Sequence, residues 1–188
     1  MDTTARKPHL RAAAALAGTL LDDLPERWTH TRAVALRVAD LARTVPAGDR
    51  EVLLAAAWLH DIGYSPETYV TGFHPLDGAL YLERHGWPDR VAALVAHHSG
   101  ADFVAAARGL PGALDRFPHE HSSVSDALTY ADHTVGPHGE PMTSDERLAD
   151  ILARHGPHSP QARAQAGRGP YLRALADRVR SRLADHPA

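Results

Sequence analysis

Apolar residues recur along this chain mostly at helical spacing, and the pattern predicts a series of α-helices. Near the start the recurring positions are Leu10, Ala14, Ala17, Leu21 and Leu24. A spacing of three or four residues places such side chains on one face of a helix. No stretch alternates apolar residues with polar β-forming residues, so no strand is expected. We predict an all-α fold, with helices at 8–23, 27–45, 48–61, 75–85, 88–99, 101–108, 122–134, 143–155 and 170–184.

Glycine and proline separate these helices and mark the turns between them. The segment 156–170 mixes proline, glycine, glutamine and arginine, and we expect it to be a loop before a terminal amphipathic helix. No internal repeat or interdomain linker is evident. A chain of 188 residues is long enough to bury one full core, so a single domain over residues 1–188 is expected.

The charge balance argues against a nucleic-acid polymer as partner. Lys plus Arg number 20 against 23 Asp plus Glu, a net charge of −3, whereas phosphate neutralisation needs an excess of basic residues. The apolar run 12–21 is too short to span a bilayer, and we read it as part of the first helix of a cytoplasmic protein without a membrane partner. Because the chain has no cysteine, any metal must be bound by His, Asp or Glu.

Histidines and aspartates recur on the apolar faces of several predicted helices. They are His30, the neighbours His60 and Asp61, the neighbours His97 and His98, and Asp132. His74 precedes Pro75 and should lie extended at a helix N-terminus. A single inward histidine is more often a hydrogen-bonded core residue than a ligand. Recurrence in helix after helix favours a shared metal site instead. The other histidines, among them His119, His133 and His155, are expected at the surface or in loops.

One motif carries a family resemblance. The string His60-Asp61-Ile62-Gly63, which follows the apolar segment 54–59, resembles the "HDIG" signature of the HD superfamily of metal-dependent phosphohydrolases. The helix around His30 resembles the first-histidine helix of that family, and Asp132 resembles its last aspartate. The stretch 74–98 resembles the extra histidines of binuclear members. The resemblance covers about residues 26–135 and implies an HD-domain helical bundle with a metal site between core helices, flanked by N- and C-terminal helices.

The resemblance also implies roles for these residues. His30, His60, Asp61 and Asp132 would bind a first divalent metal, and Asp61 would bridge to a second metal bound by His74, His97 and His98. The donor types suit Mn, Fe, Co, Ni or Zn. A metal-activated water would hydrolyse a phosphomonoester or phosphodiester of a small metabolite or nucleotide, with Asp61 and His74 as catalytic residues.

Substrate-binding residues are less clearly indicated. Nearly all the basic residues are arginine, and Arg32, Arg84 and Arg147 lie on helices near the expected cleft. Each is a candidate phosphate ligand and equally a candidate surface salt-bridge partner. Glu26 lies one turn before His30, where it is a candidate site residue or simply a first-turn carboxylate favoured by the helix dipole.

Two other functions stay open. Some HD-fold proteins use the same ligand set with a mixed-valent iron pair to activate dioxygen and cleave a C–C or C–P bond, and a third interpretation is a non-enzymatic metal- or ligand-binding module. Cyclic-dinucleotide hydrolysis is disfavoured, because Tyr64 stands where those phosphodiesterases usually carry lysine and their Gly-Tyr-Pro signature is missing. The sequence indicates neither the substrate nor the oligomeric state.

Overall fold

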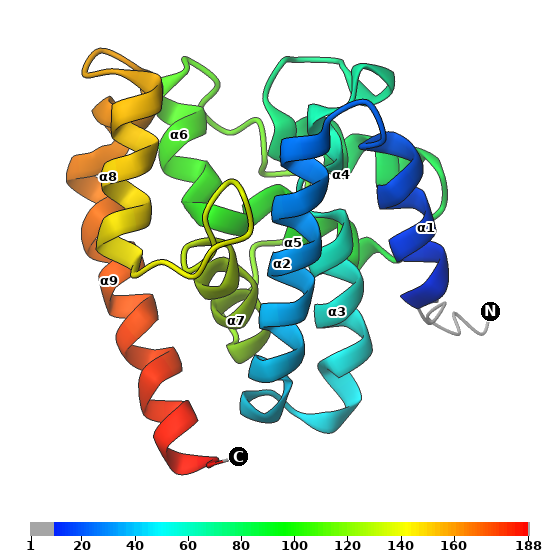
Figure 1. Ribbon diagram of the computed structural model, residues 1–188. Helices are drawn as coiled ribbons and strands as arrows, with labels where there is room; N and C mark the ends of the chain where they lie inside the picture. Colours follow the sequence, from blue (N-terminus) through cyan, green and yellow to red (C-terminus); the bar gives the residue numbers. More distant parts are fainter. Residues whose placement is uncertain (1–9, 188) are drawn as a thin grey trace.

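The computed structural model describes residues 10–187 and is built from helices (Figure 1). They are α1 (Leu10–Leu20), α2 (Pro25–Leu41), α3 (Arg50–Leu59), α4 (His74–Arg84), α5 (Asp89–His97), α6 (Ala101–Ala107), α7 (Ser123–Asp132), α8 (Ser144–His155) and α9 (Pro160–Asp185). Short 3₁₀ turns lie at Ala42–Thr44 (η1), Ala47–Asp49 (η2), Ile62–Tyr64 (η3), Pro66–Thr68 (η4) and His98–Gly100 (η5). Within residues 10–187 the β-type pairing is one isolated bridge, between Val135 and Pro141, so the all-α prediction is confirmed. The first two residues of the predicted helix 8–23 lie outside the described range.

Helices α2, α3, α5 and α7 form the centre of the bundle, and the other helices cover them (Figure 1). Helix α1 packs on α3, α4 packs on α5, and α9 packs on both α6 and α7. The central helices each bury an apolar stripe, with Val34, Leu53, Val95 and Leu128 fully buried. Burial of such stripes is the main driving force for helix packing. The prediction of inward faces on these helices is thereby confirmed.

The predicted loop 156–170 is largely helical, and this expectation was wrong. Helix α9 begins at Pro160, where the Ser159 hydroxyl caps the amide of Ala162, and it continues through Pro170. An internal proline removes one backbone hydrogen bond. The long buried face of α9 offsets that loss, because Ala164, Leu172, Leu175, Ala176 and Val179 join the core.

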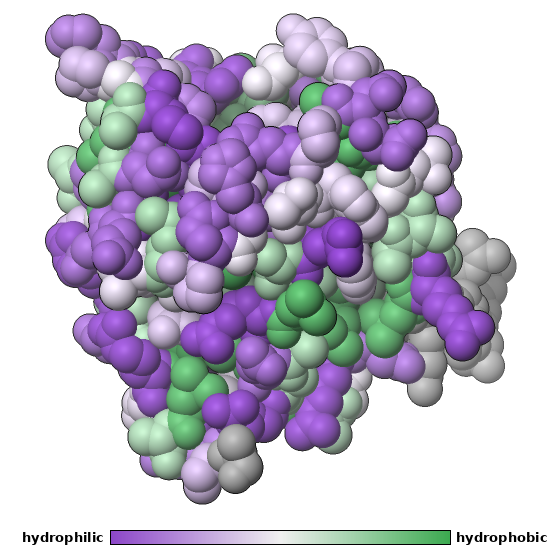
Figure 2. All heavy atoms as spheres, in the orientation of Figure 1, coloured by the Kyte–Doolittle hydropathy of each residue, from purple (hydrophilic) through white to green (hydrophobic). Residues whose placement is uncertain are grey.

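The surface in the view of Figure 2 is mainly polar, with apolar side chains scattered over it. No helix within residues 10–187 combines the length and the apolar character that crossing a bilayer requires.

Candidate metal centre

Three residues from three helices meet in the centre of the bundle. His30 from α2 and His60 at the end of α3 are fully buried, and Asp132 at the end of α7 is 8% exposed. The His30 Nε2 atom lies 3.0 Å from Asp132 Oδ1, and His60 Nε2 lies 3.9 Å from the same oxygen. The structure therefore brings together three of the residues that the sequence predicts as ligands of a first metal.

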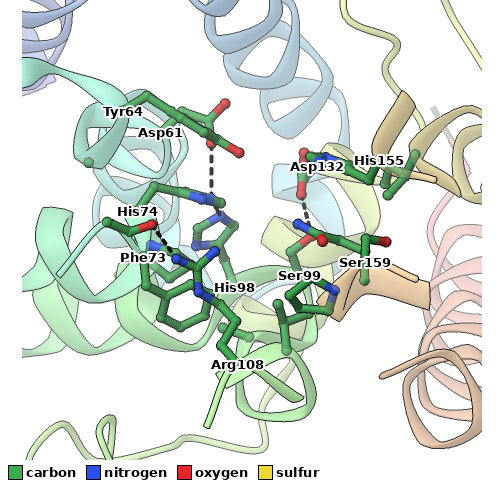
Figure 3. Close-up of a pocket in the computed structure, with 18 of the residues that line it drawn as sticks. Asp61, Tyr64, Phe73, His74, His98, Ser99, Arg108, Asp132, His155 and Ser159 are labelled. Carbon is green, nitrogen blue, oxygen red and sulfur yellow. Dashed lines mark hydrogen bonds and ion pairs between the residues drawn. The ribbon is translucent and has the colours of Figure 1, made fainter. Parts of the chain in front are cut away.

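A second group lies beside the first one and consists of Asp61, His74 and His98, which Figure 3 labels. The Nε2 atom of His74 is 3.5 Å from Asp61 Oδ1 and 3.3 Å from His98 Nε2. The other oxygen of Asp61 faces the first group, at 3.6 Å from His60 Nε2 and 3.9 Å from His30 Nε2. Asp61 thus stands between the two groups, in the position that the predicted bridging role requires.

Backbone carbonyls orient the histidines of both groups in the same way. The Nδ1–H of His30 donates to Gly136 O at 3.0 Å, that of His60 to Ala57 O at 2.8 Å, and that of His98 to Val95 O at 2.6 Å. A neutral imidazole that donates from Nδ1 carries a lone pair on Nε2. Each ring therefore presents an acceptor atom to the centre, and a hydrogen bond on the far nitrogen is the usual support of a metal-binding histidine.

The chain geometry around the HDIG string explains why neighbouring residues reach the same place. Helix α3 ends at Leu59, and Asp61 has φ −102° and ψ 4°, which starts the tighter turn η3. His60 and Asp61 consequently both point inward, although adjacent positions of a regular helix diverge by about 100°. His74 is the first residue of α4, followed by Pro75, as its sequence predicts.

The electrostatics keep these groups in the protonation states that ligands need. Burial would raise the pKa of Asp61, but the nearby His60, His74, His30 and Arg27 hold that pKa far below its ordinary value. The pKa of Asp132 also falls well below its usual range, because the contact with His30 Nε2 and the nearby His133 and His60 outweigh burial. Burial lowers the pKa of His74 to about 3. At neutral pH both carboxylates are charged and His74 is neutral.

The residues present fit a divalent metal. His60 Nε2 is buried and has no hydrogen-bond partner within the described residues. His30 Nε2 and Asp132 Oδ1 lie 3.0 Å apart beside it, and the three atoms face the same space, where a cation would bind all of them. Imidazole and carboxylate donors without thiolate suit Mn, Fe, Co, Ni or Zn.

His97 does not join this centre, and its predicted role in the second metal site is corrected. Its Nε2 donates to Phe117 O at 2.7 Å, and its Nδ1 lies 3.0 Å from Asp102. The reason is local: α5 ends at His97, His98 is extended and Ser99 has φ +63°. This break turns neighbouring side chains to opposite sides, so only His98 faces Asp61.

A cavity of about 790 Å³ opens in front of the two groups. Asp61, His74, His98 and Asp132 line one part of it (Figure 3). Of the predicted substrate contacts, Arg147 lines the cavity and is 4% exposed. Arg32, Arg84 and Glu26 are exposed and do not line it. Their helices carry these side chains on the outer face; Arg32 lies over the Trp28 ring and Glu26 faces His138.

Sequence reasoning missed several residues that line the cavity, among them Arg27, Tyr64 and Arg168. Arg27, one turn before His30 on the same face of α2, places Nη1 3.4 Å from Asp61 Oδ2, a position that its spacing could have indicated. Tyr64 follows the HDIG string and stacks on His74 at a ring distance of 4.0 Å. Arg168 was missed because it lies in the segment 156–170, which was expected to be a loop and is part of α9.

His133 is buried, against the expectation of a surface position. It is 3% exposed, and its Nε2 lies 2.6 Å from Ser99 Oγ and 3.2 Å from Arg168 Nη2. Burial lowers its pKa to about 3. The Ser99 hydroxyl donates to Asp132 Oδ2 at 2.6 Å. Because His133 and Arg168 both contact Ser99 Oγ, they hold Asp132 in place indirectly.

Comparison with known proteins gives two matches. The HD domain family matches residues 27–184, which covers most of the chain and extends past the expected core of 26–135. A tRNA (cytidine(56)-2'-O)-methyltransferase of Picrophilus torridus is 36% identical over 94 residues, which make up 48% of this chain and 26% of that protein. The match therefore spans about a quarter of the methyltransferase. No solved structure matches the chain significantly.

Proposed function

Because this chain belongs to the HD domain family, we propose that it is a phosphohydrolase that acts on a small phosphorylated metabolite or nucleotide with two bound divalent metals. The observation that carries the proposal is the convergence of imidazole nitrogens and carboxylate oxygens, among them the unpartnered His60 Nε2, beside an open cavity lined by arginine. His30, His60 and Asp132 make one set, and Asp61, His74 and His98 make the other.

In this proposal His30, His60, Asp61 and Asp132 hold one metal, while Asp61, His74 and His98 hold the second. When bound, a metal pair of this kind supplies a water of lowered pKa and positive charge for the phosphate oxygens. No serine or cysteine nucleophile is then required.

Residues of the chain itself would bind the phosphate and hold the metal ligands in place. The guanidinium of Arg27 lies beside Asp61 and over the Tyr64 ring at 5.0 Å, where it can bind phosphate oxygens next to the metal ligands. Ser99 holds Asp132 in place through the Oδ2 oxygen, which leaves Oδ1 to face His30 and His60. The stacked ring of Tyr64 fixes the orientation of His74.

The proposal is tested by elemental analysis of protein purified without a histidine tag, followed by a panel of phosphoesters. Two equivalents of Mn, Co, Ni or Zn with metal-dependent phosphate release are expected. His60→Ala and Asp61→Ala should lose metal and activity while the helical circular-dichroism signal persists. Two equivalents of iron with oxygen uptake and no phosphate release would contradict hydrolysis and favour the diiron oxygenase. A protein that stays metal-free after reconstitution would indicate a binding module.

A further inference from the structure

Arginine is concentrated in the cavity far beyond what the overall charge suggests. The chain has a net charge of −3, yet the cavity is lined by Arg27, Arg108, Arg147, Arg154 and Arg168. The carboxylates that line it are Asp61 and Asp132, and the proposed function assigns both of them to metals. With metals bound the cavity is strongly cationic, so it favours a substrate with more than one negative charge.

Four of these arginines form two pairs, one beside the candidate metal ligands and one away from them. Arg27 is 3.4 Å from Asp61, and Arg168 donates to Ser99, which in turn holds Asp132. Both therefore border the metal ligands, where the phosphoester under attack would lie. Arg147 and Arg154 project from α8 instead, and neither makes a hydrogen bond or ion pair with any candidate ligand.

The α8 pair is short of negative partners. Arg147 and Arg154 both donate to the same carboxylate, Asp150, at 2.9 Å and 2.7 Å. Arg147 is 4% exposed, and its Nε has no acceptor within the described residues. A buried cation with an unpaired N–H is costly unless a further anion is bound.

The N-terminus of α9 lies in the same wall. Ser159, Pro160 and Gln161 line the cavity, and Figure 3 shows Ser159 and His155 across from Tyr64 and Phe73. The Ser159 hydroxyl accepts from the amide of Ala162, and proline has no N–H, so among residues 10–187 the Gln161 amide has no acceptor in this first turn. Free amides and the helix dipole make such a terminus favourable for anions.

We propose that Arg147, Arg154 and the first turn of α9 form a subsite for a second oxyanion of the substrate. The inference rests on the proposed function and narrows it: the substrate is a small phosphoester that carries a further phosphate or carboxylate away from the bond that is hydrolysed. The subsite comes from α8 and α9, whereas the ligands come from α2, α4, η5, α7 and the turn that follows α3.

The test uses phosphonates, whose C–P bond resists phosphoester hydrolysis. Propylphosphonate, 3-phosphonopropionate and α,ω-alkanediphosphonates with spacers of three to eight carbons are titrated calorimetrically into the metal-loaded protein at constant ionic strength. At least one bis-anion should bind roughly tenfold or more tightly than propylphosphonate, as expected for a charge-assisted contact. The carboxylate and diphosphonate arms identify which second anion is preferred.

Two variants locate the effect. Arg154→Ala removes a partly exposed side chain, and Arg147→Gln replaces a buried one and is checked for folding by circular dichroism. Both should reduce the preference for the bis-anion and leave propylphosphonate binding unchanged. Arg180→Ala, an exposed arginine of α9 outside the cavity, is the matched control and should alter neither.

The outcomes separate this inference from the proposed function. Phosphoester hydrolysis without any preference for bis-anions would overturn the subsite and leave the hydrolase standing. A preference that persists in both α8 variants would also overturn it, because the second anion would then bind elsewhere. A preference that depends on Arg147 and Arg154 in a protein without hydrolytic activity would support the subsite and contradict the hydrolase.

Discussion

Gly63 lies directly against the backbone of His74. A β-carbon built on Gly63 would be 1.9 Å from the His74 carbonyl oxygen and 2.7 Å from the Gly78 amide nitrogen. The turn that follows His60 and Asp61 is therefore packed, without any side chain between, on the first turn of the helix that begins with His74. This close approach sets the separation between Asp61 and His74.

We predict that Gly63→Ala destabilises the protein by about 1–3 kcal/mol or more, because backbone atoms must move to admit a methyl group. The same movement pulls His74 from Asp61, so affinity for the second metal should fall more than affinity for the first. Denaturant unfolding and metal titration measure the two effects. Gly48→Ala is the matched control, since a β-carbon there meets nothing within 4 Å. Equal stability of the two variants would refute the packing argument.

A second prediction distinguishes the two neighbouring histidines at the end of α5. His98→Ala should lower the metal content by one equivalent, because His98 Nε2 faces His74 and Asp61. His97→Ala should keep both equivalents, because that ring is bound to Phe117 O and Asp102. Elemental analysis of the two variants decides the question. Loss of a metal from the His97 variant would restore the role expected from the sequence.

The contrast between His97 and His98 shows which features of the site the sequence predicts and which it does not. Helical periodicity predicts which faces point inward, and so it places His30, His60 and Asp132 correctly. It cannot predict the side to which a residue turns once the helix has ended, and the change from helical to extended backbone at His98 decides that for His97 and His98. A pattern of Gly and Pro likewise hid Arg168, because buried contacts of α9 outweigh the local preference for a loop.

Ser99 leads to a third prediction. Its hydroxyl donates to Asp132 Oδ2 at 2.6 Å, and it is the non-glycine residue with positive φ within residues 10–187. Ser99→Ala and Ser99→Gly both remove the hydroxyl, so each should weaken binding of the first metal by about 10–100-fold. Glycine also relieves the backbone strain, so the glycine variant should be the more stable of the two. Unchanged metal affinity in both variants would show that Asp132 needs no such support.

A fourth prediction concerns the pH dependence of stability. His133 is buried beside Arg168, and its pKa in the folded protein is lowered to about 3, whereas an unfolded histidine titrates near its ordinary value of 6.5. Below pH 6.5 His133 therefore binds a proton in the unfolded chain but stays neutral in the folded protein until the pH approaches 3. The contribution of His133 is fully present above pH 6.5 and is lost as pH falls from 6.5 toward 3.

At pH 5 this loss amounts to about 2 kcal/mol for one such histidine. His133→Asn should therefore make the drop in unfolding free energy between pH 7 and pH 5 smaller by about that amount, even if the variant is less stable at both pH values. Denaturant unfolding is measured after chelation, so that protons and metal do not compete for the ligands. His138→Asn, which removes an exposed imidazole, is the control and should leave the drop as it is. An equal drop in wild type and His133→Asn would mean that His133 is protonated in the folded protein, which the adjacent guanidinium of Arg168 opposes.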